Sequence, residues 1–326
     1  MTILVTGGAG YIGSHTVRRL RGLGHDLVVL DDLSTGNEAS LLGAPFVRGD
    51  IRDTDLVRST CRTHHVTQLV HFAAFKAVGE SMTEPGKYWR NNVAGTVDLV
   101  EAVLAEGVRE MVFSSSCSVN GTPSVVPLTE DSPLHPESVY AATKAMVEQI
   151  LGWYGQTHGL RSVCLRYFNA AGASSDGVIG EDWTYCQNLV PLVMKAALGV
   201  IPELSVFGDD YPTPDGTCVR DYIHIEDLAE AHVLSLDHLR SGGPQGEPSI
   251  ALNVGTGVGT SVLEVIRATE RISGRQVPHR IVARRAGDPT ATWADPRRVA
   301  EVIGWHATRG LEEIITSAWQ WHSRTA

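Results

Sequence analysis

Three side chains near the middle of the sequence, Ser116, Tyr140 and Lys144, are of types that together can move a proton. Tyr140 and Lys144 are four residues apart, so on a helix they lie on one face. A phenol, with a pKa of about 10, is a poor base near neutral pH, but a neighbouring ammonium group favours the phenolate. Ser116 follows an apolar run and can hydrogen-bond a reacting oxygen. The pattern predicts proton transfer by Tyr140, although a Tyr and a Lys at this spacing also occur on ordinary amphipathic helices.

The chain around these residues alternates between short apolar runs, typical of strands, and longer periodic stretches, typical of helices. The expected strands are Thr2–Thr6, Asp26–Leu30, Pro45–Gly49, Gln68–Phe72, Glu110–Ser114 and Arg161–Tyr167. The expected helices are Ile12–Leu23, Asp53–Thr63, Asn91–Gly107 and Ser138–Gly159. Strict alternation predicts an α/β fold with a Rossmann-type doubly wound parallel sheet, which binds ligands at the carboxyl ends of its strands.

A glycine-rich turn, TGGAGYIG, lies directly between the first expected strand and the first expected helix. In a dinucleotide-binding loop Gly7 makes the tight turn, Gly10 lets backbone amides approach a pyrophosphate, and Gly13 lets the helix pack on the strand. The expected helix begins at Ile12, and its N-terminus adds partial positive charge. Tyr11 and Ile12, between the last two glycines of the loop, are also expected to contact the dinucleotide. An ordinary turn is the alternative, but the strand-turn-helix context favours a dinucleotide.

Acidic residues end the second expected strand. Asp31 follows the turn by about 20 residues, where a carboxylate can accept hydrogen bonds from both hydroxyls of an adenine ribose. With Asp32 beside it, a 2′-phosphate would meet two negative charges, so the sequence predicts NAD rather than NADP. Asp50 and Ile51, after the third strand, stand where the adenine is expected, and a helix cap and a core residue explain them equally well.

The alternation ends after Phe168, where stretches rich in Gly, Ala, Ser and Pro begin. Residues 219–239 again resemble a strand followed by a helix that opens at Asp227. Residues 251–259 and 290–295 are typical of smaller, mixed structure. We therefore expect a Rossmann domain over residues 1–168, to which 219–248 return, and a smaller mixed C-terminal substrate domain made of residues 169–218 and 249–326.

The composition narrows the class of partner. The net charge of −10 argues against nucleic acid and against an anionic membrane, because both require clustered Lys and Arg. The five cysteines show no C-x-x-C pair, which is typical of a reducing cytosol and predicts no metal site. Apolar stretches are shorter than the roughly 20 residues of a membrane span, and the first residues lack the pattern of a signal peptide. We expect a cytoplasmic protein that binds a small molecule.

These motifs resemble the extended short-chain dehydrogenase/reductase family and, within it, the UDP-glucose 4-epimerase group. The resemblance covers nearly the whole chain through TGGAGYIGSHT, GDIRD, HFAAFKAVGES, NNVAGT, FSSSCS, YAATK, MVEQIL, RYFNAAGA, FGDDYPTPDGTCVRDYIH and ARRAGDPTATWAD. It implies NAD-dependent interconversion of UDP-glucose and UDP-galactose through a 4-keto sugar. In that reaction Tyr140 removes the proton of the 4-hydroxyl, Ser116 steadies the oxygen, and Lys144 lowers the pKa of Tyr140 and holds the nicotinamide ribose.

The same resemblance implies binding residues. Around NAD, besides the glycine turn, Asp31, Asp32, Asp50, Ile51, Tyr140 and Lys144, it implies Phe72, Ala73, Lys76, Asn91 and Tyr167. Around the UDP-sugar, besides Ser116 and Tyr140, it implies Lys76, Ser118, Phe168, Asn169, Asn188, Leu189, Val206, Phe207, Arg220, Arg285, Asp288 and Thr292. The two arginines would let an acidic protein hold a diphosphate, because guanidinium groups bind it in a forked geometry. A homodimer, paired through Asn91–Gly107 and Ser138–Gly159, is also implied.

The chain departs from the group pattern at a few positions. Asn120 replaces a Tyr, Val139 a Pro and Ala74 a Gly. Thr292 stands where relatives restricted to UDP-glucose and UDP-galactose carry a Tyr, so we expect UDP-N-acetylglucosamine and UDP-N-acetylgalactosamine to be accepted as well.

Three alternative functions of a protein with this fold stay open. A nucleotide-sugar oxidoreductase would release NADH. A dehydratase would eliminate water and would carry Asp and Glu just after the serine position, where this chain has Cys117 and Ser118. A catalytically silent NAD-sensing protein would commonly lose Tyr140 or Lys144, and both are present.

Overall fold

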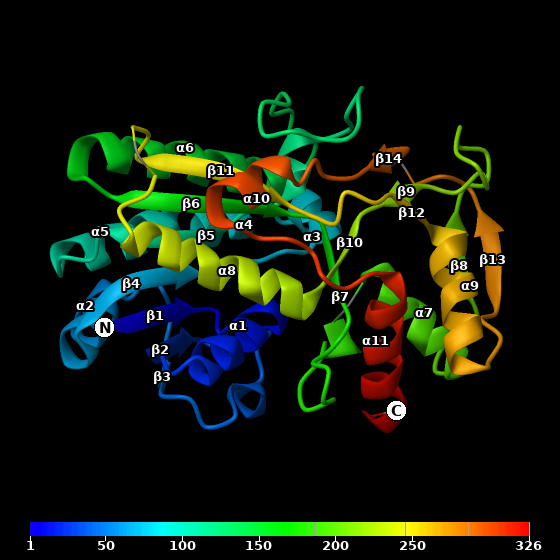
Figure 1. Cartoon of the computed structure of the whole chain (residues 1–326), viewed down its shortest axis with the longest axis horizontal. Coiled ribbons are helices and arrows are strands. Elements are labelled where there is room, and N and C mark those ends of the chain that lie inside the picture. The colour runs from blue at the N-terminus through cyan, green and yellow to red at the C-terminus, as the bar shows by residue number, and fades with distance from the viewer. Residues whose placement is uncertain (186, 245, 286, 326) are drawn as a thin grey trace.

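Seven parallel strands form the central sheet, in the order β11-β6-β5-β4-β1-β2-β3 (Figure 1). The computed structural model describes every residue except 186, 245, 286 and 326. The strands are β1 (Thr2–Thr6), β2 (Asp26–Asp31), β3 (Phe46–Arg48), β4 (Val66–His71), β5 (Glu110–Ser114), β6 (Arg161–Tyr167) and β11 (Ser249–Val254). The strand order reverses between β1 and β4, which is the point where such sheets open for a ligand. The predicted doubly wound fold is confirmed.

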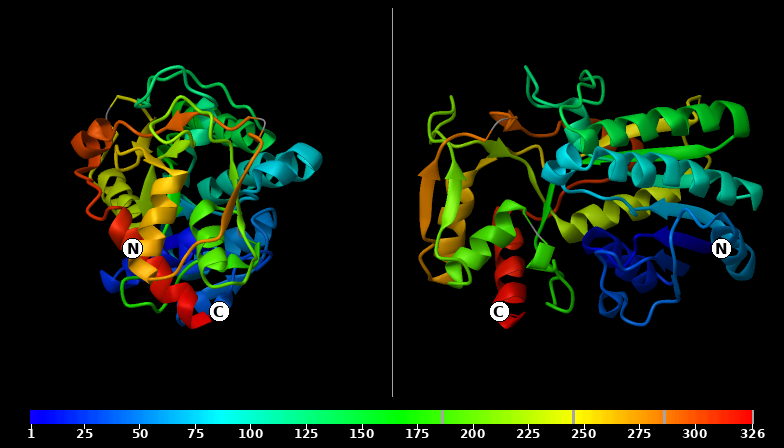
Figure 2. Two further views of the ribbon diagram at one scale, coloured as in Figure 1. Left: turned by 90° about the vertical axis from the view of Figure 1, so that its right-hand side faces the viewer. Right: turned by 180° about the vertical axis from the view of Figure 1, so that it is seen from behind.

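Helices cover both faces of this sheet, because each strand is apolar on both sides. The helices α1 (Tyr11–Gly22), α8 (Ile225–Arg240) and α10 (Arg297–Ile303) share one apolar core with it. The helices α2 (Thr54–His64), α5 (Gly95–Ala105) and α6 (Val139–His158) share the core on the opposite face. Figure 1 shows α8 in front of the sheet, and the view from behind in Figure 2 shows α5 and α6 over the other side.

The helix that carries Tyr140 has well-formed ends. Ser138 is the N-cap of α6, and its hydroxyl accepts a hydrogen bond from the N–H of Ala141 at 3.2 Å. Gly159 ends the helix with a φ of +70°, a left-handed conformation that glycine adopts without strain. The helix therefore starts one residue before Tyr140, close to the prediction, and holds that residue in its first turn.

The segment predicted as one helix over Asn91–Gly107 begins differently. A π-helical segment, η2 (Trp89–Ala94), precedes α5, and two short helices, α3 (Val78–Thr83) and α4 (Pro85–Tyr88), precede η2. The amide of Asn92 bonds to both backbone groups of Phe75 and to the hydroxyl of Thr143 on α6. These side-chain bonds to the loop after β4 fix the irregular helical start.

A smaller domain lies beside the carboxyl ends of the strands, at the right of Figure 1. Its helices are α7 (Leu189–Ala197), α9 (Val262–Ser273) and α11 (Leu311–Thr325), which share a separate apolar core. Its strands are β8 (Leu204–Phe207) with β13 (His279–Val282), and β9 (Val219–Arg220) with β12 (Thr260–Ser261) and β14 (Ala291–Thr292). The strands β7 (Asn169–Ala171) and β10 (Tyr222–His224) pair with each other where the chain crosses between the domains.

The expected domain boundary is wrong for part of the C-terminal half. Ser249–Val254, which we assigned to the substrate domain, is strand β11 and pairs with β6 from Ser162 to Tyr167. Val299, Ile303 and Trp305 also pack into the core of the large sheet. The sequence did not predict this, because a single apolar run does not show which sheet the strand joins. The helix α8 likewise begins at Ile225, two residues before the predicted start.

Among the described residues, no helix is long and apolar enough to cross a membrane.

Candidate active site

Two glycines of the turn between β1 and α1 have no room for a side chain. Gly7 has a φ of +71°, and a Cβ there would lie 2.4 Å from the backbone nitrogen of Ala73. A Cβ on Gly13 would lie 2.3 Å from the carbonyl oxygen of Gly7. Gly10 is the N-cap of α1, so the free amides of the helix start beside a bare backbone. This cradle fits the pyrophosphate of a dinucleotide.

The carboxylate of Asp31 lies directly beside that turn, at the end of β2. Its oxygens accept hydrogen bonds from the N–H groups of Ala9 at 2.9 Å and Leu33 at 2.8 Å. Burial raises the pKa of Asp31 above its ordinary value, and the two backbone bonds counter that effect. Asp32 accepts from the N–H of Ser34 at 2.8 Å. Two carboxyl groups beside the glycine turn suit a ribose with free hydroxyls and disfavour a 2′-phosphate.

Asp50 and Ile51 have structural partners. The carboxylate of Asp50 forms an ion pair with Arg52, and that hydrogen-bonded partner lowers the pKa of Asp50. Ile51 is buried in the core beneath α2 and α5. Ile51 thus has the core role that the sequence left open, whereas the N-cap of α2 is Asp53 and not Asp50. Adenine binding by Asp50 and Ile51 stays a prediction.

Aromatic residues surround the carboxyl ends of β4 and β6. The N–H groups of Phe72 and Ala73 both donate to the carbonyl oxygen of Thr6, which ties the end of β4 to the end of β1. The ring of Phe72 lies 4.7 Å from the ring of His232, and Tyr167 lies 6.4 Å from the same ring. The hydroxyl groups of Tyr167 and Ser114 are 2.8 Å apart. Phe72, Ala73 and Tyr167 thus gather at the edge where the glycine turn lies.

The three residues predicted to move a proton meet at this same edge. Lys144 donates from Nζ to the carbonyl oxygen of Ser114 at 2.7 Å, and Nζ lies 5.9 Å from the centre of the Tyr140 ring. A hydrogen bond with the side chain of Ser116 lowers the pKa of the Tyr140 hydroxyl. Ser116 also accepts hydrogen bonds from the N–H and the hydroxyl of Ser118, the latter at 2.9 Å. All three predicted side chains are buried.

Burial decides the ionisation of this group. It raises the pKa of Tyr140, and nearby Tyr167 adds to the rise, whereas the bond to Ser116 lowers it. Burial also lowers the pKa of Lys144 to about 7, and the negative charge of Glu148 counters that fall. The predicted lowering of the Tyr140 pKa is therefore absent from the chain by itself, because desolvation is the largest influence and Lys144 is not among the groups that shift this pKa.

Other predicted cofactor residues have partners of their own. The hydroxyl of Tyr11 donates to the carbonyl oxygen of Gly172 at 2.6 Å, and the amide of Asn91 donates to Asn92 at 3.0 Å. The side chain of Lys76 is 64% exposed, and its Nζ lies 3.9 Å from Glu181. The ammonium group of Lys76 is therefore accessible to a ligand.

A second group of predicted residues lies in the smaller domain. Asp288 bonds to Arg285 at 2.8 Å and lies 3.8 Å from Arg220. The guanidinium group of Arg285 lies 5.3 Å from the centre of the Phe207 ring, and that ring is partly exposed. Arg220 is held by the carbonyl oxygens of Val219 and Pro289. The structure thus brings together two cations, a carboxylate and an exposed aromatic face.

Thr292 connects this second group to the first. It lies on β14, directly opposite Arg220 of β9. Two residues later, Ala294 packs with Phe168 and Leu128, and Cys117 contacts the same cluster. Cys117 adjoins Ser116, so the cluster lies between Thr292 and the serine. Thr292 is itself buried.

Four predicted substrate residues are held by secondary structure. Asn169 lies on β7, and its N–H donates to the carbonyl oxygen of Asp221. Asn188 is the N-cap residue of α7, which begins at Leu189, and its amide lies 3.5 Å from Glu181. Val206, on β8, is buried in the core of the smaller domain, and its contact with a ligand stays a prediction.

Comparison with known proteins identifies the family. Residues 3–255 match the family described as the NAD dependent epimerase/dehydratase family. The chain belongs to this family. It is 46% identical to UDP-glucose 4-epimerase of Bacillus subtilis (strain 168), over 99% of this chain and 97% of that protein.

Solved structures of this epimerase/dehydratase family agree with the fold. UDP-glucose 4-epimerase from Brucella ovis, in complex with NAD, is 46% identical with a TM-score of 0.95, over 98% of both chains. UDP-glucose-4-epimerase from Stenotrophomonas maltophila, with bound NAD and formylated UDP-arabinopyranose, is 42% identical with a TM-score of 0.95, over all of both chains.

The departures from the group pattern also have structural outcomes. The amide of Asn120 donates to the carbonyl oxygens of Ser132 and Pro133 and so holds the long loop that leads to α6.

Burial raises the pKa of the Cys117 thiol to about 12, which makes it inert near neutral pH. Among the described residues, no cluster of three metal-ligating side chains occurs.

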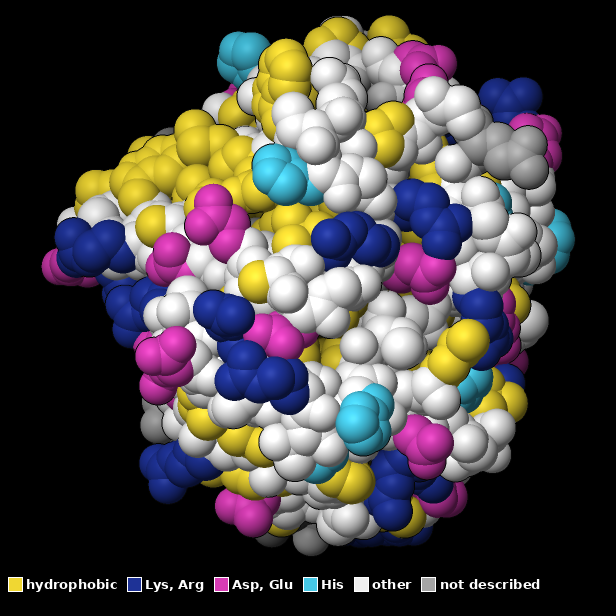
Figure 3. All heavy atoms as spheres, turned by 90° about the vertical axis from the view of Figure 1, so that its left-hand side faces the viewer, with side chains coloured by type: hydrophobic (Ala, Val, Ile, Leu, Met, Phe, Trp, Pro, Cys, Tyr) yellow, Lys and Arg dark blue, Asp and Glu magenta, His cyan; other side chains and the backbone are white. Residues whose placement is uncertain are grey.

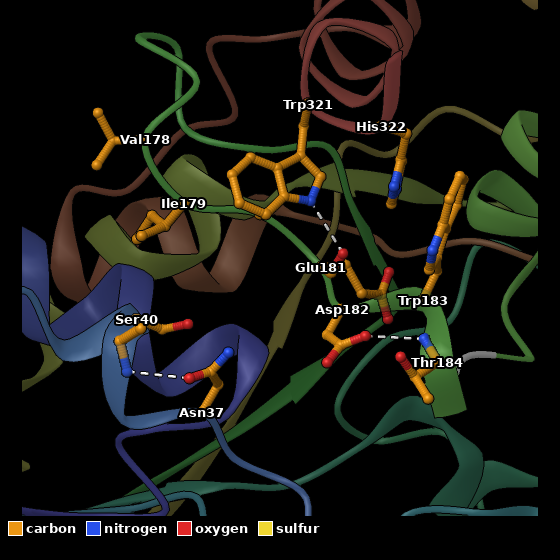
Figure 4. A pocket seen from close by; sticks show the side chains of 12 residues that line it. Asn37, Ser40, Val178, Ile179, Glu181, Asp182, Trp183, Thr184, Trp321 and His322 are labelled. Atoms are coloured by element: carbon orange, nitrogen blue, oxygen red, sulfur yellow. Dashed lines mark hydrogen bonds between the residues drawn. The ribbon is translucent and has the colours of Figure 1, made fainter. Parts of the chain in front are cut away.

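A pocket of about 350 Å³ lies elsewhere on this epimerase/dehydratase chain, and no predicted site residue lines it. It lies between the start of η1 (Glu38–Leu41), the segment 178–184 and the helix α11 (Figure 4). Trp183 stacks on His322 at 4.5 Å, and the indole of Trp321 donates to the carbonyl oxygen of Glu181. None of the residues that line the pocket belongs to the group around Tyr140, although Glu181, one of them, lies 3.9 Å from Lys76.

Three residues with buried side chains beside the site were not predicted from the sequence. Glu148 accepts hydrogen bonds from Ser115 and from Arg166, and both oxygens of its carboxylate are engaged. Glu148 lies one helical turn after Lys144, a spacing that could have pointed to it. Ser115 and Arg166 carry no such signal, because their contacts with Glu148 join different elements.

Proposed function

We propose that Tyr140, Ser116 and Lys144 interconvert UDP-glucose and UDP-galactose through a 4-keto sugar. The protein is an NAD-dependent UDP-glucose 4-epimerase, an isomerase, as are relatives about 45% identical over nearly its whole length. The observation that carries the proposal is the meeting of the Tyr140, Lys144 and Ser116 side chains beside the glycine turn. Bound NAD would accept the hydride from C4 and return it.

Each residue of the group has one task. Tyr140 takes the proton of the C4 hydroxyl on its phenolate oxygen and gives it back when the ketone is reduced. Ser116 donates a hydrogen bond to the C4 oxygen as charge develops there. Lys144 holds positive charge near the phenolate, which opposes the effect of burial on Tyr140. Its bond to Ser114 fixes where that charge lies.

The group around Asp288 supplies a site for the UDP portion. Arg220 and Arg285 offer forked donors to a diphosphate, and the Phe207 ring offers an apolar face to a base. Lys76, whose side chain is 64% exposed, adds a third cation. Anchoring the nucleotide leaves the sugar free to present either face of C4 to the cofactor.

The dehydratase and oxidoreductase alternatives find less support. A dehydratase needs an acid and a base beside the serine, whereas Cys117 is a buried thiol with a pKa of about 12. Ser118 uses its hydroxyl to donate to Ser116. With no additional proton carrier at these positions, the residues favour oxidation followed by reduction of one carbon.

We also propose a broader range of sugars, with Thr292 as the residue that permits it. A Tyr at position 292 would place an aromatic ring at the wall of the site, and Thr leaves that volume free. An N-acetyl group at C2 of the sugar would occupy it. UDP-N-acetylglucosamine and UDP-N-acetylgalactosamine are then further substrates.

A homodimer through α5 and α6 is the proposed assembly. On α6 the side chains of Met146 and Trp153 are 42% and 66% exposed, and Ile150 and Tyr154 line a shallow apolar hollow beside Trp153. Figure 3, which faces the left-hand side of Figure 1, shows hydrophobic surface gathered at its upper left. Such a surface is typical of a two-fold helix-pair interface.

A cytoplasmic location accords with four free cysteines among the described residues.

The function is tested by incubating the purified protein with UDP-galactose and no added NAD, and by following UDP-glucose. Conversion without net formation of NADH is expected, because the cofactor is regenerated in each turnover. Accumulation of NADH or loss of water from the sugar would instead identify one of the alternatives.

A further inference from the structure

A buried ion pair lies directly behind the proton-transfer group. The side chains of Glu148 on α6 and Arg166 on β6 are 8% and 6% exposed, and they bond through both carboxylate oxygens at 2.6 to 3.1 Å. Isolated buried charges are costly, so such a pair persists where its partners are fixed. The tasks assigned to Ser116, Tyr140 and Lys144 do not use it.

The pair is attached to the serine segment. The hydroxyl of Ser115 donates to Glu148 at 2.5 Å, and Ser115 is fully buried. Its neighbours on either side are Ser114, whose carbonyl oxygen accepts from Lys144, and Ser116, which bonds to Tyr140. A single carboxylate therefore fixes the backbone that positions both partners of the base.

The pair also sets the charge around Lys144. Tyr140, Lys144 and Glu148 follow one another at four-residue intervals on α6 and share a face. The titratable groups that face this region from other elements are His71 on β4, and Cys164 and Arg166 on β6. Burial lowers the pKa of His71 to about 3 and raises that of the Cys164 thiol, so both are neutral near pH 7. Glu148 supplies the negative charge that favours a protonated Lys144.

We propose that Glu148, held by Arg166, is a positioning residue for epimerisation: it fixes the Ser114–Ser116 segment and maintains the positive charge on Lys144. The proposal rests on the roles assigned above to Tyr140 and Lys144. Glu148 itself touches neither substrate nor cofactor, and it acts through Ser115 and Lys144.

The test compares wild type with Glu148→Gln and with the double variant Glu148→Gln/Arg166→Gln. Glutamine keeps the size and can still accept from Ser115, but it removes the charge. The double variant leaves no unpaired arginine, so it remains informative where the single variant fails to fold. The matched control is Glu110→Gln, which breaks the Glu110–Arg161 pair between the first residues of β5 and β6, whereas Ser114 and Arg166 lie near the other ends of these strands.

The measurements are kcat and KM for UDP-galactose across pH, with melting temperature and bound NAD as checks on folding. Without Glu148, Lys144 should lose its proton at lower pH, so the alkaline fall of kcat should move down by roughly one pH unit. The value of kcat at pH 8 should drop about tenfold with little change in KM. Glu110→Gln should keep the wild-type profile.

Glu148→Asp provides a rescue, because it keeps the charge. Its alkaline limb should return toward the wild-type position even where the shorter side chain lowers kcat. A folded, NAD-containing Glu148→Gln or double variant with the wild-type alkaline limb would overturn the inference. The assigned roles of Tyr140 and Lys144 are tested separately by their own substitutions, so they would survive that result.

Discussion

The ammonium group of Lys144 donates to the carbonyl oxygen of Ser114 at 2.7 Å, and this bond joins the helix of the base to the strand of the serine. The two elements lie next to each other in space although they are far apart in the sequence. Because the bond fixes Nζ, the positive charge is held 5.9 Å from the centre of the Tyr140 ring. The chain thus organises a cation beside a buried phenol before any ligand is considered.

Replacement of Tyr140 by Phe should abolish most activity without harming the fold. The ring still fills its buried space, but the oxygen that takes the C4 proton is lost. We expect kcat to fall by about 10²- to 10⁴-fold, with bound NAD and melting temperature close to wild type. A variant that retains more than about a tenth of the wild-type rate would contradict the role of Tyr140.

Replacement of Lys144 by Met should alter the pH dependence of catalysis. Burial lowers the pKa of Lys144 to about 7, so the ammonium form is present at low pH and is lost as pH rises through that value. Wild-type kcat should therefore fall on the alkaline side. In Lys144→Met, Tyr140 must ionise without the cation, so the remaining activity should rise with pH. A variant with an unchanged profile would show that Lys144 does not govern Tyr140.

The lowered pKa of Lys144 also predicts an effect on the stability of the protein. Between pH 7 and the ordinary pKa of lysine, about 10.4, the unfolded chain binds a proton that native Lys144 does not. The free energy of unfolding contributed by this residue therefore rises with pH over that window, and the burial cost is fully present below it. Relative to wild type, Lys144→Met should be most stabilised near pH 6, and the gain should shrink toward pH 10. Thermal melts at several pH values measure this, and a pH-independent difference would contradict it.

The proposed dimer should be broken by charge on the outer face of α6. Trp153→Glu replaces an exposed indole, so it costs a monomer little but places a carboxylate in the interface. Light scattering at micromolar concentration should give a dimer for wild type and a monomer for the variant. Val125→Glu, at a similarly exposed apolar residue outside α6, is the control and should remain dimeric. A monomeric wild type would remove the assembly from consideration.

The parts of the site that sequence predicted are those whose chemistry is local. Gly7 and Gly13 are marked by spacing, Asp31 by its place after a strand, and Tyr140 and Lys144 by helical periodicity. The partners of Glu148 could not be read in this way, because Ser115 reaches it from the segment after β5 and Arg166 from β6. Burial was equally invisible, which is why the pKa of Tyr140 is raised where the neighbouring lysine alone predicted a fall.

Strand β11 shows the corresponding limit for the fold. Its apolar residues are typical of any buried strand, and its partner β6 is distant in the sequence. Only pairing in space, continued by the packing of Trp305 and α10 on the same sheet, assigns it to the large domain. The other six strands of this sheet were predicted because each is followed by its own helix or turn, which fixes its place locally.

The last prediction concerns the size of the sugar site and uses Thr292→Tyr. Thr292 is buried on β14 opposite Arg220, and Ala294 beyond it packs against Phe168, so a larger residue at 292 meets fixed neighbours on the protein side. The added ring must then take its room from the sugar pocket. We expect wild type to convert both UDP-galactose and UDP-N-acetylgalactosamine. In Thr292→Tyr, kcat/KM for the N-acetylated sugar should fall at least about tenfold, the scale on which a pocket wall excludes a group that does not fit. The value for UDP-galactose serves as the internal control and should change far less, since that sugar carries only a hydroxyl at C2. A wild type without N-acetyl activity, or a variant in which both sugars lose kcat/KM equally, would show that Thr292 does not set the substrate range.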